Sequence, residues 1–356
     1  MVLKRIIKPW IYSDDTVAEI TEEKTPPRRL VSWHFCPSWL QFNEFVLSGY
    51  RCNFTMSECL DSLTYLHNES VNIYSHGIPF ILFVVMIPLT ASEACLQNPF
   101  WFSFHYFSCF IPFFSSLIYH LFMCHHHGQK TYDSLLNFDM CGIWAVNAFG
   151  ALCGIRATLF CFPIWRNLAV MTYLIISCAS LSFILRAKTP KERFAPMAVF
   201  GVLRYMFLCV RLALKFLGYG CGSNEALKYC FLMDSFACVG GLINIARIPE
   251  KWYPGQFDLF GNSHQIMHVM SAISVLFLHL GVTHEFEWMS TKFSVKCHKP
   301  LIKALLALPW LLFQLKVNCT RDIYQSRGKL RLKKKKAALP GRVEFSWGRK
   351  KDQRKK

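Results

Sequence analysis

Charged side chains are scarce in this chain. They make up 17% of its 356 residues, whereas 53% of the residues are hydrophobic. Soluble domains usually carry about 25% charged residues. The apolar residues gather in runs long enough to cross a membrane, and such runs recur along most of the chain. This pattern argues against a soluble helical protein and predicts an integral membrane protein.

Two other common signals are also missing. None of the 16 cysteines has the paired spacing of a zinc finger, and most lie inside apolar runs, so we interpret them as small buried hydrophobes and not as a disulfide framework. The first 70 residues contain no apolar core of about 7–15 residues, so we expect no cleavable signal peptide. Because these residues carry both charge signs, we predict an extramembrane N-terminal region over residues 1–70.

Seven apolar runs follow, each about 20 residues long, which is enough for a helix to cross a hydrocarbon core of about 30 Å. They lie near residues 71–92, 100–122, 138–160, 164–185, 195–217, 229–247 and 264–283. The predicted fold is therefore an all-α integral membrane protein, with a seven-transmembrane helix bundle over residues 71–285. Within residues 286–320, a weaker stretch from Leu301 to Val317 is either an eighth span or an interfacial helix, which we favour slightly.

Much of the net charge of +18 lies near the C-terminus, where residues 321–356 form a basic tail that we predict to be disordered. Such a tail suits anionic lipid headgroups at least as well as nucleic acid, and we expect the lipid bilayer as partner and no nucleic acid. Lysine and arginine in the short connections favour a cytosolic N-terminus. Seven spans would then place the basic tail on the side opposite the cytosol, although basic segments favour the cytosolic side. An eighth span would bring the tail back to the cytosol.

Two histidines, His264 and His268, stand four residues apart at the start of the last apolar run. On a helix this spacing puts both imidazoles on one face, where they could share a metal ion with at least one further ligand. With a cytosolic N-terminus, the second run ends at the same depth with His120, and the third run begins there close to Asp139. The sequence thus predicts a metal site within the membrane, near its cytosolic face.

Histidine and aspartate are expensive inside a membrane unless they are paired, hydrated or bound to metal. Three histidines with an open fourth position are the pattern of a catalytic zinc site, where the pKa of bound water falls to about 7. Asp139 would hydrogen-bond that water or a ligand imidazole, and Ser116, one turn before His120, could donate to a developing oxyanion. We interpret residues 125–127, three adjacent histidines, as solvated sequence, because their side chains would point in different directions on a helix.

Several motifs resemble the progestin and adipoQ receptor family of seven-helix membrane proteins, which is grouped with the alkaline ceramidases among membrane hydrolases. The resemblance covers about residues 39–290. It rests on Asn68-Glu69-Ser70-Val71-Asn72 with His76, Ser116-x-x-x-His120, Asp139-Met140-Cys141-Gly142, Arg247-Ile248-Pro249-Glu250 and Ser263-His264-Gln265-Ile266-Met267-His268. It implies that His120, His264 and His268 are zinc ligands, with Asp139 and Ser116 beside them.

The resemblance also implies a function, the zinc-dependent hydrolysis of the ceramide amide to sphingosine and a fatty acid. A membrane lipid would be the substrate or ligand, and the Golgi, another endomembrane or the plasma membrane would be the location. The alternative is a receptor or scaffold whose zinc is structural, with protein partners that the sequence does not name. Many relatives have aspartate-tyrosine-glycine where this chain has Asp139-Met140-Cys141-Gly142, which changes the neighbours of the carboxylate and not the carboxylate itself.

Overall fold

A computed structural model describes residues 30–291 of the chain. The predicted C-terminal segment from Leu301 to Val317 and the basic tail lie outside the described residues, as do residues 1–29. Within residues 30–291 the secondary structure is helical, apart from two isolated β-bridges. The prediction of an all-α protein is therefore confirmed for this part of the chain.

Seven helical segments of the described region are long and apolar enough to cross a membrane. The helices that form them are α3 (Ser70–Leu89), α5 (Pro99–Phe122), α6 (Gln129–Gly150) with α7 (Leu152–Thr158), α8 (Pro163–Arg186), α9 (Pro190–Phe216), α10 (Asn224–Ala246) and α11 (Ser263–Thr291). A short helix, α4 (Glu93–Leu96), lies in the connection between α3 and α5. Each predicted apolar run corresponds to one of these segments, so the seven-transmembrane prediction is confirmed.

The outer faces of the bundle are apolar. In α10, only 6% of the apolar window is buried inside the protein, although its mean hydropathy is 1.5. Large side chains such as Ile81 on α3, Ile175 on α8 and Val202 on α9 are more than half exposed. A soluble protein rarely exposes contiguous apolar surface on this scale, whereas lipid tails cover it at no cost.

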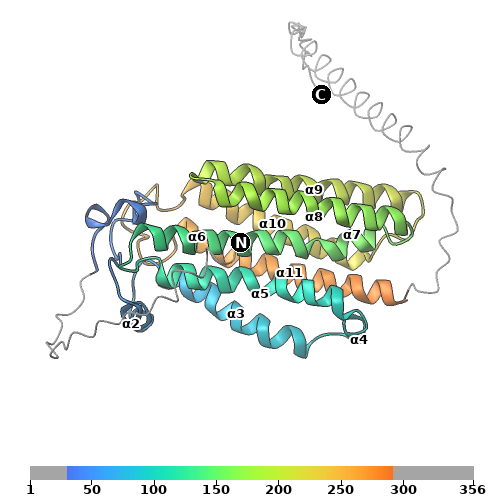
Figure 1. Ribbon diagram of the computed structural model, residues 1–356, viewed down its shortest axis with the longest axis horizontal. Helices are drawn as coiled ribbons and strands as arrows, with labels where there is room; N and C mark the ends of the chain where they lie inside the picture. Colours follow the sequence, from blue (N-terminus) through green and yellow to red (C-terminus); the bar gives the residue numbers. More distant parts are fainter. Residues whose placement is uncertain (1–29, 292–356) are drawn as a thin grey trace, which may run out of the picture. The chain divides into compact units, whose positions relative to one another are not determined.

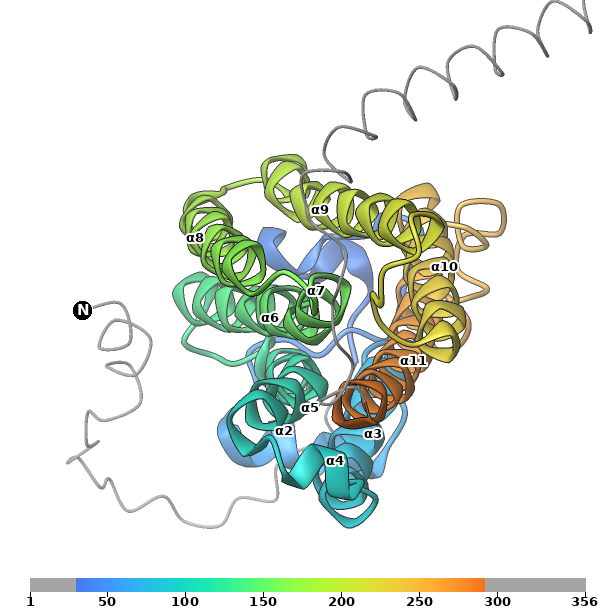
Figure 2. The same cartoon turned by 90° about the vertical axis from the view of Figure 1, so that its right-hand side faces the viewer.

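The helices run side by side along the long axis of the bundle (Figure 1). In the end-on view, α8 and α9 lie on one side and α3 and α4 on the other, with α5, α6, α10 and α11 between them (Figure 2). Helix α10 packs along α11, while α5 packs along both α6 and α3. Glycines allow the closest approaches: a Cβ at Gly142 of α6 would overlap Ser115 Oγ of α5, and one at Gly240 of α10 would lie 2.8 Å from Met270 Cβ of α11.

Two helix boundaries differ from the predicted runs more than the others do. The third run is predicted to start near residue 138, but α6 begins at Gln129. The first turns of α6 are polar and pack against the N-terminal segment instead of lipid, so the apolar run begins later than the helix. The last run is predicted to end near residue 283, but α11 continues to Thr291. Its last turns include Glu285, which is buried and forms an ion pair with Arg211 of α9. Both predicted boundaries are therefore wrong because charged residues within the helices make the apolar runs shorter than the helices themselves.

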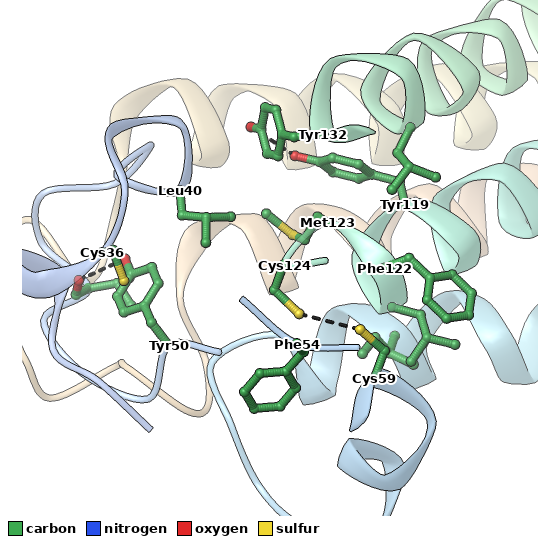
Figure 3. Close-up of a cluster of buried hydrophobic side chains, with 14 residues drawn as sticks. Cys36, Leu40, Tyr50, Phe54, Cys59, Tyr119, Phe122, Met123, Cys124 and Tyr132 are labelled. Carbon is green, nitrogen blue, oxygen red and sulfur yellow. Dashed lines mark hydrogen bonds between the residues drawn. The ribbon is translucent and has the colours of Figure 1, made fainter. Parts of the chain in front are cut away.

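The segment of residues 30–69 covers one end of the bundle. It contains the short helices η2 (Trp33–Phe35), η3 (Ser38–Leu40), α2 (Met56–Asp61) and η4 (Ser62–Thr64). Its side chains form one buried apolar cluster with the end of α5 and the start of α6, in which Leu40 and Phe54 lie near Tyr119, Met123 and Tyr132 (Figure 3). This cluster fixes the end of α5 from which His120 projects.

Cysteines are mostly unpaired in the described residues. Cys161, in the connection between α7 and α8, is disulfide-bonded, and the other cysteines of residues 30–291 are free. Many of the free ones are buried among apolar side chains, as predicted for most of the cysteines. Cys161 is the exception, and its disulfide bond could not be predicted from the spacing of cysteines along the sequence.

Candidate metal centre

The end of α5 is held by a buried arginine. Arg51, only 2% exposed, donates from Nη2 to the carbonyl oxygen of His120 at 2.7 Å and from Nη1 to that of Leu121 at 3.1 Å. It also donates to Ser62 Oγ at 2.7 Å. The last carbonyl groups of a helix have no partner within the helix, and a cation placed there also favours the helix dipole. Arg51 thereby fixes the backbone that carries the His120 side chain.

The start of α11 is held by a buried carboxylate. Glu250, fully buried in the connection between α10 and α11, accepts hydrogen bonds from Ser263 N at 2.7 Å, from Ser263 Oγ and from Asn43 Nδ2 at 3.1 Å. Asn262 Oδ1 accepts from Gln265 N at 3.1 Å. A negative charge and a side-chain cap both stabilise a helix N-terminus. These contacts place the first two turns of α11, where His264 and His268 lie.

The imidazoles of His120, His264 and His268 come together between α5 and α11. One nitrogen from each ring lies within 4.8 Å of the others. The ring centroids are 5.3 Å apart for His120 and His264, 4.7 Å for His120 and His268, and 4.6 Å for His264 and His268. His120 and His268 are each 2% exposed, and His264 is partly buried. This geometry allows the three side chains to share one ion.

Each of the three rings has an oxygen beside its Nδ1 atom. Nδ1 of His120 lies 2.7 Å from Glu69 Oε2, whereas Nδ1 of His268 lies 3.3 Å from Ser75 Oγ and Nδ1 of His264 lies 3.3 Å from Asn244 Oδ1. In metal-ligating histidines the N–H of the second ring nitrogen usually donates a hydrogen bond to such an oxygen, which fixes the tautomer. With hydrogen on each Nδ1, every Nε2 offers a lone pair, and that of His120 is buried with no hydrogen-bond partner. The donor set therefore suits Zn²⁺ and other ions that bind imidazole.

Glu69, the residue just before α3, is a buried acidic residue beside the three histidines. Burial opposes its ionisation, but hydrogen bonds from His120 and from Asn72 Nδ2, the latter at 2.7 Å, outweigh burial and lower the pKa of Glu69 to about 2. Glu69 is thus a carboxylate at neutral pH. It supplies a negative charge one side chain away from the three imidazoles.

Asp139 and Ser116 lie on facing parts of α6 and α5. Gly142, one turn after Asp139, contacts α5 at Ser115, so Asp139 lies at the level of the α5 turn from Ser116 to His120. Both side chains are buried, and Ser116 Oγ has no hydrogen-bond partner. Asp139 is not one of the three residues whose donor atoms cluster. It therefore stands beside the histidine group and not within it.

Several residues of the centre escaped the sequence reasoning. Glu69, Ser75 and Asn244 come from three separate places in the chain, and only the fold brings their oxygens to the histidines. His76 belongs to one of the family motifs but had no assigned role, and its ring stacks on that of His268 with centroids 3.8 Å apart and 12° between the planes. Two signals were available for Glu69 and His76: both belong to a family motif, and both are costly to place so close to a membrane span.

The arrangement of residues 125–127, the three adjacent histidines, differs in one respect from the prediction. His126 and His127 are exposed, as expected, but one nitrogen from each of residues 125–127 lies within 4.8 Å of the others. The prediction that their side chains point apart is wrong because they lie in the turn after α5 and not on a helix. A third group in the described region, His105 with Cys109 and His279, was not predicted.

Seven membrane-length helices with a histidine group between α5 and α11 define a class of heptahelical membrane proteins. Comparison with known proteins agrees, because residues 64–279 match the family described as "Haemolysin-III related". The chain is 43% identical over 261 residues to mouse "Progestin and adipoQ receptor family member 4", and this match covers 73% of the chain and 94% of the mouse protein. The human protein of the same name gives the same figures.

A more distant relative, "Heptahelical transmembrane protein 1" of Arabidopsis thaliana, is 29% identical over 296 residues, covering 75% of the chain and 84% of the plant protein. The chain therefore belongs to the progestin and adipoQ receptor family within the haemolysin-III related proteins. The resemblance found from the sequence motifs is confirmed. The family matches extend through the helices that carry the histidines.

Proposed function

We propose that the protein is a zinc-dependent membrane hydrolase that cleaves the amide of ceramide or a related sphingolipid to give a sphingoid base and a fatty acid. The observation that carries this proposal is the convergence of His120, His264 and His268, each with an oxygen beside Nδ1 and therefore with Nε2 free. Three protein ligands leave a fourth position open, which is the arrangement of catalytic zinc sites.

Bound zinc in such a site lowers the pKa of water to about 7 and polarises a carbonyl oxygen. The chain supplies the remaining groups. Asp139 is a buried carboxylate at the level of His120, suited to orient water or to accept its proton. Ser116 has a buried hydroxyl without a partner, which can donate to the oxygen of the amide as charge develops there. Glu69 holds the His120 ring in the tautomer that presents Nε2.

The position of the histidines supports a lipid as substrate. His120 lies in the last turn of α5, and His264 lies in the first turn of α11, so the group is at one end of the membrane-spanning helices. A ceramide in a bilayer keeps its amide near the headgroups and its chains in the hydrocarbon. Its amide can therefore reach this depth while both chains stay in apolar surroundings. The resemblance to proteins grouped with the alkaline ceramidases favours the amide bond as the one that is cleaved.

The test is ceramide turnover by the purified protein and by Asp139→Asn and Ser116→Ala. Loss of an acid–base group typically costs about 10²–10⁴ in rate, and loss of an oxyanion donor costs about 10²–10³. We expect both variants to keep bound zinc and to lose turnover by these factors. Full turnover in both variants would refute the roles assigned to the two residues.

A receptor or scaffold with a structural zinc is the competing function, and the printed names of the mouse and human relatives contain the word receptor. This alternative predicts no turnover by the purified wild-type protein, together with unchanged cellular function in Asp139→Asn and Ser116→Ala. Structural zinc sites usually have four protein ligands. The histidine group offers three donors in the described residues, which favours the enzyme.

A further inference from the structure

We propose that the bundle contains a second metal site, formed by His105, Cys109 and His279, for a thiophilic d¹⁰ cation such as Zn²⁺ or Cu⁺. His105 and Cys109 are one turn apart on α5, and His279 faces them from α11. One donor atom from each residue lies within 4.8 Å of the others. His105 and Cys109 are four residues apart, as are His264 and His268. Within each pair, the two side chains therefore lie on the same face of their helix.

The distances fit a shared ion. His105 Nε2 lies 3.0 Å from His279 Nδ1 and 3.6 Å from Cys109 Sγ, which is also 3.8 Å from the other nitrogen of His105. Around a tetrahedral zinc with bonds of about 2.0–2.1 Å to nitrogen and 2.3 Å to sulfur, two nitrogens lie about 3.3 Å apart, and nitrogen and sulfur lie about 3.6 Å apart. Small shifts of the two imidazoles would therefore admit an ion.

This group is distinct from the first histidine group. His105 precedes His120 by 15 residues on α5, and His279 follows His268 by 11 residues on α11. At a rise of 1.5 Å per residue, these separations are about 22 Å and 16 Å along the helices. The second group therefore lies toward the opposite end of the bundle, too far from the first for the two groups to share an ion.

The apolar surroundings of this group favour a bound cation whose charge is largely balanced by its ligands. His105 is 2% exposed, Cys109 is fully buried, and Phe102 lies beside the ring of His105. An apolar shell limits the access of solvent to such an ion. A thiolate and two neutral imidazoles suit soft or borderline cations, and thiolate ligands select Cu⁺ and Zn²⁺ over hard ions. A plain hydrogen bond between the two histidines is the competing explanation, and it requires no metal.

Cobalt distinguishes the two explanations. Co²⁺ bound to a thiolate gives a sulfur-to-metal charge-transfer band, which an all-histidine site cannot give. We expect purified metal-free protein titrated with Co²⁺ to show this band, and added Zn²⁺ or Cu⁺ to bleach it. Cys109→Ser and His279→Gln should lose the band and one equivalent of metal. Cys153→Ser, which removes a buried cysteine outside the three groups, should keep both.

The site of the proposed hydrolysis is tested separately, because His264→Ala should keep the cobalt–thiolate band while it removes the other equivalent of metal. Size-exclusion profiles of the variants check that each one is folded. Absence of the band in the wild-type protein, or its survival in Cys109→Ser, would overturn the second site. Metal analysis of the protein as purified then tells which cation it carries.

Discussion

The three histidines of the candidate centre are held by three different oxygens: the carboxylate of Glu69, the hydroxyl of Ser75 and the amide of Asn244. The contact with Glu69 is the shortest of the three and is the one that involves a charge. Hydrogen bonds to charged groups are roughly twice as strong as those between neutral groups. Among these partners, Glu69 should therefore contribute most to the basicity and orientation of a ligand.

Glu69→Gln should accordingly weaken zinc binding by about 10–100-fold, the usual cost of losing a partner that orients a ligand. Glutamine keeps the shape of the side chain, so the fold should survive. The measurement is zinc affinity by competition with a chromophoric chelator. Glu93→Gln, which changes an exposed glutamate of α4, is the matched control. Equal affinities for Glu69→Gln and the wild-type protein would contradict the role of Glu69.

At the scale of elements, the close pairing of α10 with α11 carries one side of the centre. Gly240 lets the two helices meet, because a Cβ there would lie 2.8 Å from Met270 Cβ and 3.4 Å from Met267 Cα. Asn244 is one turn further along α10 and faces His264 of α11. Any displacement of α10 from α11 should therefore reach the histidine group.

Gly240→Ala should lower the melting temperature and weaken zinc binding, because the added methyl group pushes against Met270. The adjacent Gly241→Ala is the matched control, since a Cβ there meets nothing within 4 Å. In a helix, alanine is favoured over glycine by about 1 kcal/mol, so Gly241→Ala should be neutral or slightly stabilising. Thermal unfolding in detergent and zinc titration measure both effects. Equal behaviour of the two variants would show that the contact at Gly240 is unimportant.

At the scale of the whole molecule, the distribution of charge predicts an orientation in the membrane. The connection between α8 and α9 contains Lys188, Arg193 follows in the first turn of α9, and the connection between α10 and α11 contains Lys251. Basic residues favour the cytosolic side, so the end of the bundle covered by residues 30–69 is predicted to be cytosolic. The histidine group lies at this same end, beside Arg51 and Glu250.

Glycosylation tests this orientation. Asn53-Phe54-Thr55 matches the acceptor pattern, and Asn53 is exposed. If the N-terminal side is cytosolic, Asn53→Gln should leave the electrophoretic mobility of protein from animal cells unchanged. A glycan lost in Asn53→Gln would reverse the orientation. The pattern at Asn318, outside the described residues, reports on the other end: a glycan there indicates seven spans, and its absence fits an eighth.

The fold was largely predictable from the sequence because hydrocarbon thickness sets the length of each apolar run. The sequence also singled out His120, His264 and His268, since topology alone placed them at one depth. It could not supply Glu69, Ser75 or Asn244, because their contacts depend on how the helices pack. The group at His105 escaped for the same reason. Cys109 looked like one more small buried hydrophobe, and His279 lies well away from it in sequence.

The most direct test of the proposed function is ceramide turnover by purified protein as zinc is removed and restored. The wild-type protein should lose turnover on chelation and regain it with zinc. His264→Ala should lose turnover and one equivalent of zinc, whereas His284→Ala, which changes a partly exposed histidine further along α11, should keep both. Unchanged ceramide turnover in His264→Ala would contradict the account.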